Sequence, residues 1–174
     1  MDVEDLSNGV VTLRRWREGD AAAIVECMDG EPDIARWLDQ VPQPYTVEDA
    51  RAFITGFGEL SFAITDAETG RLLGSIGFGP VADGVGEIGY WVRGDARGRG
   101  VASAALVLLS RWALGQEGVK RVYLNADVDN TPSRRVAERA GFQLEGVLRS
   151  AHWNARLGRR QDWAHYSLLP GDLA

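Results

Sequence analysis

Between residues 90 and 109, a strand-like segment, a glycine-rich loop and an apolar helix-like segment follow one another without interruption. The stretch reads YWVRGDARGRGVASAALVLL, with glycines at 94, 98 and 100. A helix that begins directly after such a loop presents unpaired backbone N–H groups and the positive end of its dipole at one point. The chain must therefore form a sheet in which one strand leads into a helix, and the junction predicts an anion site.

The side chains of the loop favour phosphate as that anion. Arg97 and Arg99 carry forked donors that suit phosphate oxygens, and Gly98 and Gly100 allow the backbone to approach a ligand closely. Together they predict a pyrophosphate site. A P-loop is excluded, because that motif needs Lys and then Ser or Thr after its last glycine, where this chain has Val-Ala.

Two other interpretations of the loop stay open. It can be a structural turn whose arginines only face solvent. It can also be a dinucleotide-binding turn, since Gly98, Gly100 and Ser103 approach the G-x-G-x-x-G/A pattern and Asp127 follows near the end of the next strand. Repeated βαβ units are missing, however, and the motif does not follow the first strand, which weighs against a dinucleotide.

Hydrophobic periodicity and turn residues predict an alternation of strands and helices over the whole chain. Strands are expected at 10–16, 60–66, 71–79, 85–93, 121–128, 142–153 and 160–169. Helices are expected at 21–29, 33–38, 49–57, 101–116 and 133–140, with Asp20 capping the first and a Thr46–Asp49 capping box opening the third. Only the connection from 85–93 to 121–128 needs a crossover helix between parallel strands, so we expect a mixed sheet in an α/β (α+β) domain.

Length and composition narrow the class of protein further. With 174 residues, the chain suits one domain over 1–174. It has no apolar run of about 18 residues and no secretory signal, so no membrane partner is expected. The net charge of −6 speaks against nucleic acid as a partner. A single cysteine, Cys27, and two scattered histidines predict a reduced, cytoplasmic setting and no metal.

The segment Arg97-Gly-Arg-Gly-Val-Ala102 resembles the R/Q-x-x-G-x-G/A signature of the GCN5-related N-acetyltransferase (GNAT) family. LRRWREGDA near the start, EIGYWV before the loop, N-x-x-S-x-x-V-x-E-x-x-GF at 130–142 and GRRQDWAHYSLL near the end resemble its RimJ/RimL-type branch. The resemblance runs from about residue 10 to 170. It implies a mostly antiparallel sheet of about seven strands flanked by helices, with a V-shaped splay at the central strands.

The same resemblance implies an N-acyltransferase that moves an acetyl group, or another acyl group such as succinyl, from acyl-CoA to a primary amine. The amine belongs to a protein N-terminus or a small molecule, and the attack is direct, without an acyl-enzyme. A catalytically silent acyl-CoA-binding module is the main alternative, and a dinucleotide-dependent oxidoreductase is the third. The resemblance leaves a homodimer open.

Site residues follow from the resemblance. The pantetheine arm would lie between strands 85–93 and 121–128. The residues implied to bind the cofactor are Trp91, Val92, Arg93, Arg97, Gly98, Arg99, Gly100, Val101, Ala102, Ser103, Asn125, Asn130 and Ser133.

Two residues carry the implied chemistry, because an amine must lose a proton before it attacks and the departing thiolate gains from a donor. Glu87 is the expected base, with His152 and Asp162 as rivals, and Ser133 is the expected acid. Glu138 is expected in a salt bridge or a cap. The acceptor is expected to lie against Trp37, Tyr45, His152, Trp153 and Asp162, with Trp163 as a further candidate.

Overall fold

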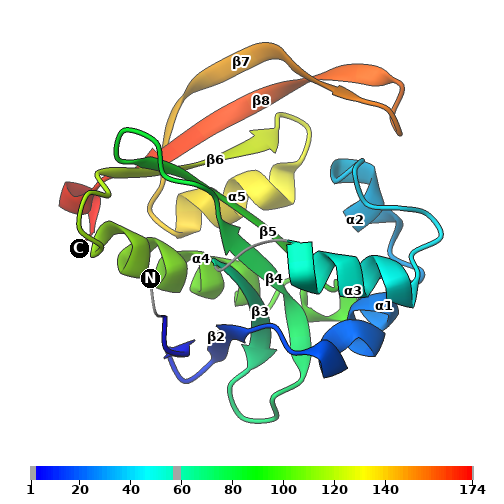
Figure 1. Ribbon diagram of the computed structural model, residues 1–174. Helices are drawn as coiled ribbons and strands as arrows, with labels where there is room; N and C mark the ends of the chain where they lie inside the picture. Colours follow the sequence, from blue (N-terminus) through cyan, green and yellow to red (C-terminus); the bar gives the residue numbers. More distant parts are fainter. Residues whose placement is uncertain (1–2, 57–59, 174) are drawn as a thin grey trace.

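An open sheet runs through the computed structural model, which describes residues 3–56 and 60–173 (Figure 1). Within these residues it has eight strands in the order β1-β2-β3-β4-β5-β6-β8-β7. The strands are β1 (Leu6–Ser7), β2 (Val11–Arg15), β3 (Ser61–Asp66), β4 (Leu72–Phe78), β5 (Val85–Val92), β6 (Arg121–Asp127), β7 (Gln143–Asn154) and β8 (Arg159–Leu168). All seven expected strands are present, and the two-residue β1, which is too short to show a pattern, adds an eighth. The expectation of a mixed, mostly antiparallel sheet is confirmed, since only β5 and β6 pair in parallel.

Five α-helices of the described chain flank the sheet. They are α1 (Ala21–Met28), α2 (Pro32–Trp37), α3 (Val47–Gly56), α4 (Val101–Leu114) and α5 (Thr131–Arg139). Three short 3-10 segments at Glu18–Asp20, Gly94–Ala96 and Pro170–Asp172 connect or end elements. No helix among the described residues is long and apolar enough to cross a membrane. Phe57, the expected last residue of the third helix, lies outside the described residues.

Alternating side chains divide the core between the two faces of the sheet. Phe62 and Ile64 of β3 pack into the large cluster that contains the buried face of α4, whereas Ala63 between them joins a second cluster with α1. The same division holds on β5, where Val92 joins the α4 cluster and Trp91 joins the α1 cluster. Helices α4 and α5 therefore cover one face, and α1, α2 and α3 cover part of the other.

The helix starts confirm some expectations and correct others. Thr46 and Asp49 form the expected capping box, with backbone N–H bonds of 2.8 and 3.2 Å to each other's side chains. Asp20 does not cap α1: its carboxylate accepts the Arg17 N–H and pairs with Arg14 at 2.8 Å, so the prediction for Asp20 was wrong. Helix α5 begins two residues earlier than expected, because Asn130 caps it.

The two central strands separate after a short paired stretch. β5 and β6 pair at Val85–Arg121, Gly86–Val122 and Glu87–Tyr123, and no pairing between them continues beyond these positions in the described chain. Both strands run on, β5 to Val92 and β6 to Asp127, each held by its outer neighbour. This is the expected V-shaped splay. It leaves backbone groups of both strands facing a gap inside the sheet.

Candidate active site

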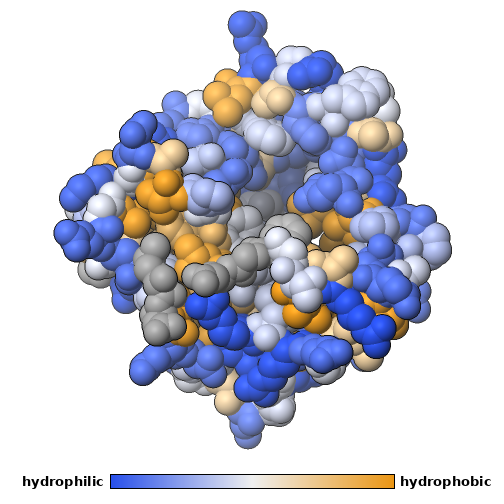
Figure 2. Space-filling model, in the orientation of Figure 1, coloured by the Kyte–Doolittle hydropathy of each residue, from blue (hydrophilic) through white to orange (hydrophobic). Residues whose placement is uncertain are grey.

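A cavity of about 750 Å³ lies at the splay. Its walls come from the separated ends of β5 and β6, the start of α4, the inner side of α5, the α2 segment and the β7–β8 hairpin. Figure 2 shows the molecule hollowed on this side, beneath the hairpin. The cavity therefore reaches both faces of the sheet through the gap between its central strands.

Most of the predicted site residues line this cavity. The lining includes Trp37, Glu87, Trp91, Val92, Arg97, Gly98, Gly100, Val101, Ala102, Ser103, Asn125, Asn130, Ser133, His152 and the further candidate Trp163. Five predicted residues do not line it: Tyr45, Arg93, Arg99, Trp153 and Asp162.

The glycine-rich loop turns through left-handed backbone conformations before α4. Gly98 and Gly100 have φ of 71° and 77°, and Gly100 is the N-cap of α4 without any side-chain cap bond. A Cβ at either position would meet no atom within 4 Å, so the backbone conformation rather than space requires glycine. The first N–H groups of α4 consequently point into the cavity mouth without a protein partner on their own helix, which suits an anion.

The two loop arginines contribute less than the sequence suggests. Arg97 donates through Nε to Val92 O at 3.2 Å, and its guanidinium lies 3.4 and 3.5 Å from Glu31 and Asp33. Arg99 is exposed and does not line the cavity. The donors that this loop offers to an anion are therefore mainly backbone N–H groups.

Arg93 is the clearest correction among the predicted cofactor residues. Its N–H donates to Leu73 O at 2.9 Å, and its buried guanidinium bonds Asp95 at 2.7 Å and Glu26 at 3.0 Å. Since backbone direction alternates along a strand, Trp91 also turns its backbone toward β4, whereas Tyr90 and Val92 turn theirs toward the splay. The resemblance implied that the backbone of Arg93 bonds the pantetheine arm, but its N–H belongs to the β4–β5 pairing and its side chain ties β5 to α1.

Tyr90 is a site residue that the sequence reasoning missed. Its hydroxyl lies 2.9 Å from Ser133 Oγ, on the α5 side of the sheet. Burial raises the pKa of Tyr90 to about 12, although the Ser133 contact opposes the shift. Asn130 Oδ1, not Ser133, caps α5 by accepting the Ser133 N–H at 3.3 Å, which leaves the serine hydroxyl to Tyr90 and the cavity. The sequence did contain a signal for Tyr90: side chains alternate along EIGYWV, so Tyr90 shares one face of the strand with Ile88 and Val92.

Glu87 lies on the opposite face of the sheet from Tyr90, as its odd position on β5 requires. Asn125 Nδ2 donates to its Oε1 at 3.3 Å, and Tyr123 Oη donates to its Oε2 at 3.4 Å. Asn125, predicted as a cofactor contact, lines the cavity and also contacts the predicted base. The carboxylate is exposed and faces the cavity.

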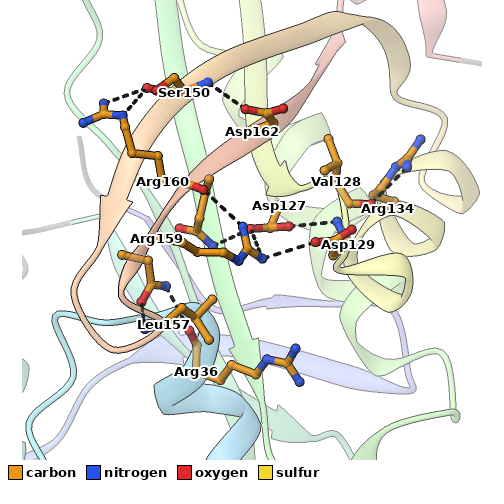
Figure 3. A network of polar contacts seen from close by, with 12 residues as sticks. Arg36, Asp127, Val128, Asp129, Arg134, Ser150, Leu157, Arg159, Arg160 and Asp162 are labelled. Atoms are coloured by element: carbon orange, nitrogen blue, oxygen red, sulfur yellow. Dashed lines mark hydrogen bonds and ion pairs between the residues drawn. The ribbon is translucent and has the colours of Figure 1, made fainter.

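The β7–β8 hairpin and the α2 segment meet above this face. His152 Nε2 lies 3.0 Å from Asp39 Oδ1, and its ring stacks on Trp163 at 5.5 Å. Asn154 donates to Arg36 O at 3.0 Å, and Arg156 donates to Val41 O at 2.7 Å. Figure 3 shows how the hairpin approaches Arg36. These contacts roof the cavity with aromatic rings and a carboxylate.

The remaining predicted acceptor residues are engaged elsewhere. Asp162 accepts the Ser150 N–H at 2.7 Å within the hairpin. Trp153 lies half exposed on the edge strand β7, and Tyr45 packs in the α1 cluster. The Glu138 carboxylate accepts a hydrogen bond from Tyr166 Oη at 3.0 Å, and among the described residues it makes neither the ion pair nor the helix cap that was expected.

A buried acid closes the inner end of the cavity. Asp127 accepts Gln161 Nε2 at 2.6 Å, Arg159 Nη2 at 3.4 Å and the Asp129 N–H at 2.8 Å (Figure 3). Both carboxylate oxygens are occupied, so Asp127 is not available to a ribose hydroxyl. This removes the acid on which the dinucleotide interpretation depended. No group of three His, Cys, Asp or Glu side chains in the described parts of the chain could hold a metal ion.

Comparison with known proteins agrees with this geometry. The family model for the acetyltransferase (GNAT) domain matches residues 11–143. The uncharacterized N-acetyltransferase p20 of Bacillus licheniformis is 29% identical over 99% of both chains. The ribosomal-protein-serine acetyltransferase of Escherichia coli is 38% identical over 48% of each chain.

A solved structure shows the same fold. The ribosomal-protein acetyltransferase RimL, in complex with coenzyme A, superposes with a TM-score of 0.85 over 95% of this chain and 98% of that one, at 22% identity. The family match covers the splayed strands, the loop, α4 and α5. The chain therefore belongs to the GNAT acetyltransferase family, as an N-acetyltransferase that uses an acyl-CoA donor and an amine acceptor.

Proposed function

We propose that this chain transfers an acetyl group to the primary amine of a peptide N-terminus or a small cationic molecule, with Glu87 as base and Ser133 as acid. One observation carries the proposal. A single cavity joins Glu87 on one face of the splay to the Tyr90–Ser133 pair on the other and to the start of α4. A thioester lying in the gap would have a carboxylate on one side and a hydroxyl donor on the other.

The donor fits the cavity in one direction. Backbone N–H groups at the start of α4 would bind the pyrophosphate, with Gly98 and Gly100 giving them access. The splay-facing backbone groups of Tyr90 and Val92 would bond the amides of the pantetheine arm, as a third strand would. That direction brings the thioester toward Ser133 and Glu87.

The residues then divide the chemistry. Glu87 removes a proton from the attacking ammonium, directly or through a water. A backbone N–H near Val92 stabilises the charge that develops on the thioester oxygen. Ser133 passes a proton to the departing thiolate and regains one from solvent water, and Tyr90 orients the serine hydroxyl. The rival bases have weaker support, because His152 is paired with Asp39 and Asp162 does not line the cavity.

The roof supports a cationic acceptor. Trp37 and Trp163 offer aromatic faces, which attract ammonium groups, and Asp39 adds a carboxylate. Burial of Asp39 raises its pKa, but hydrogen bonds from Ala155 and His152 outweigh this, and the net pKa lies below the ordinary value. Asp39 is therefore ionised at neutral pH.

A turnover assay tests the proposal. Purified protein is incubated with acetyl-CoA and a panel of peptides with free N-termini, spermidine and an aminoglycoside, and CoA release is followed with a thiol reagent. We expect release that depends on one class of amine and falls in Glu87→Gln. Tight CoA binding without turnover on any amine would instead support a catalytically silent acyl-CoA-binding module.

A further inference from the structure

A line of polar side chains crosses the open face of the sheet and ends at Glu87. Arg121 Nη2 donates to Glu145 Oε2 at 3.0 Å and lies 2.9 Å from His165 Nε2. His165 Nδ1 lies 2.7 Å from Asn125 Oδ1, and Asn125 Nδ2 donates to Glu87 at 3.3 Å. The line connects β7, β8, β6 and β5, with Asn125 directly opposite His165 in the sheet register.

The chemistry of the end member fixes the direction of every hydrogen bond in the line. A guanidinium has only donors, so His165 Nε2 must be the acceptor from Arg121. The imidazole is then neutral, with its single proton on Nδ1, and this N–H donates to Asn125 Oδ1. The Asn125 amide group can therefore present only its NH₂ to Glu87. Each member donates toward the carboxylate.

His165 also supports the second donor to Glu87. Its ring lies against Tyr123, with the ring centroids 5.2 Å apart, and Tyr123 Oη donates to the other oxygen of Glu87 at 3.4 Å. Burial, and after it the charge of Glu87, raises the pKa of Tyr123, which keeps the phenol a donor. The charged groups that face His165 are Arg121 from β6 and Glu145 from β7, with Glu87 beyond its two donors.

We propose that His165 and Arg121 are positioning residues for Glu87: a neutral His165, oriented by Arg121, fixes Asn125 and Tyr123 so that they hold the Glu87 carboxylate aimed into the cavity. This inference deepens the proposed function, since it rests on Glu87 as the base. The side chains of Arg121, His165 and Glu145 do not line the cavity, so they act on Glu87 only through Asn125 and Tyr123.

The tautomer is tested without any assay of activity. The chain has two histidines, so His152→Asn leaves His165 as the only one in a ¹⁵N-histidine sample. Long-range ¹H–¹⁵N spectra at neutral pH should show Nδ1 protonated and Nε2 unprotonated, and Arg121→Met should disturb that pattern. A proton on Nε2, alone or on both nitrogens, would overturn the proposal.

A double-mutant cycle tests the positioning role. With acetyl-CoA and the panel amine that reacts fastest, His165→Leu should lower kcat about tenfold, a fraction of what a positioned base supplies, with little change in KM for acetyl-CoA. In a Glu87→Gln background the same change should have no further effect. His165→Asn, which can keep a donor near the Nδ1 position, should recover part of the rate.

The outcomes separate the inference from the proposed function. Additive effects of His165→Leu and Glu87→Gln would overturn the positioning role while acyl transfer stands. If Glu87→Gln keeps full kcat, or if no panel amine reacts, the assigned base fails and the positioning role fails with it, although the tautomer still reports the hydrogen-bond line. Gln143→Leu is the matched control: Gln143 begins β7 of the same hairpin, and its loss removes a hydrogen bond of 2.9 Å to Asp172, beyond the end of β8, which should leave kcat unchanged.

Discussion

The hydroxyl groups of Tyr90 and Ser133 lie 2.9 Å apart and join β5 to α5 across the splay. The pair is anchored from both sides, because Tyr90 belongs to the sheet and Asn130 fixes the first turn of α5. A serine hydroxyl held in this way has a defined direction before any substrate binds. This pre-organisation is what a proton donor to a thiolate requires.

Ser133→Ala should slow turnover by about 100-fold, the low end for positioned acid catalysis. CoA affinity should change little, because the contact forms mainly in the transition state. The melting temperature should also change little, since Asn130 and not Ser133 caps the helix. Asn130→Ala is the counterpart, expected to lose about 1 kcal/mol of stability. Steady-state kinetics and thermal melts on both variants check this, and an unchanged kcat in Ser133→Ala would remove the serine as the acid.

Glu87→Gln should reduce the rate most at neutral pH and least at high pH. Below the pKa of the acceptor amine the substrate is protonated and needs a base, whereas above it the free amine attacks unaided. A pH–rate profile of kcat/KM for both proteins measures the difference. A Glu87→Gln profile parallel to that of the wild type would point to another base.

Gly100→Val should abolish CoA binding while the fold persists. Gly100 has φ of 77° and open space around the position of a Cβ, so the expected damage is a shift of the loop backbone away from the phosphate-binding conformation. Gly118→Val is the control, because Gly118 has φ of 87°, equally open space and a place beyond the C-terminal end of α4, at the opposite end of that helix from the loop. Calorimetry with CoA should separate the two variants. Equal affinities would mean that the loop does not hold the pyrophosphate.

CoA or acetyl-CoA should raise the melting temperature. A ligand present at 100 times its dissociation constant adds about 2.7 kcal/mol to stability. NADH should have little effect, since Asp127 has no free oxygen for a ribose. A thermal-shift series at equal ligand concentrations checks this, and a shift with NADH but none with CoA would contradict the acyltransferase site.

Asp39→Asn should destabilise the protein at neutral pH and not in strong acid. The folded-state pKa of Asp39 lies below its ordinary value, so its contribution is complete above the unfolded pKa of about 3.9 and is lost as the pH falls through the lower folded value. Denaturant unfolding of both proteins between pH 7 and pH 2.5 tests this. A stability difference that grows toward low pH would reverse the sign and reject it.

Local pattern was enough to predict the strands, the loop and the start of α4. The strand periodicity at 85–93 and the glycines at 98 and 100 can be read from residues that are neighbours in sequence. The structure has strand β5 over the first segment and positive φ at both glycines. The roof was not predictable in this way. His152 meets Asp39 across 113 positions of sequence, and no local signal pairs them.

Arg93 shows the opposite limit. The resemblance implied that its backbone bonds the pantetheine arm, but its N–H donates to Leu73 O of β4 at 2.9 Å and its guanidinium pairs with Glu26, 67 positions earlier in the chain. A motif identifies the strand that faces a cofactor, but which of its backbone groups face the cofactor depends on how the neighbouring strand pairs with it.

The splay also determines how the two substrates meet. Because side chains alternate along β5, Glu87 and Tyr90 face opposite sides of the sheet, and the cavity connects those sides. With Glu87 as base and Ser133 as acid, as proposed, donor and acceptor would approach from different directions and react within the thickness of the sheet. Neither substrate would have to leave before the other binds, so the geometry favours a ternary complex. The order of binding and release would then depend on the two affinities, because neither substrate blocks the entry of the other.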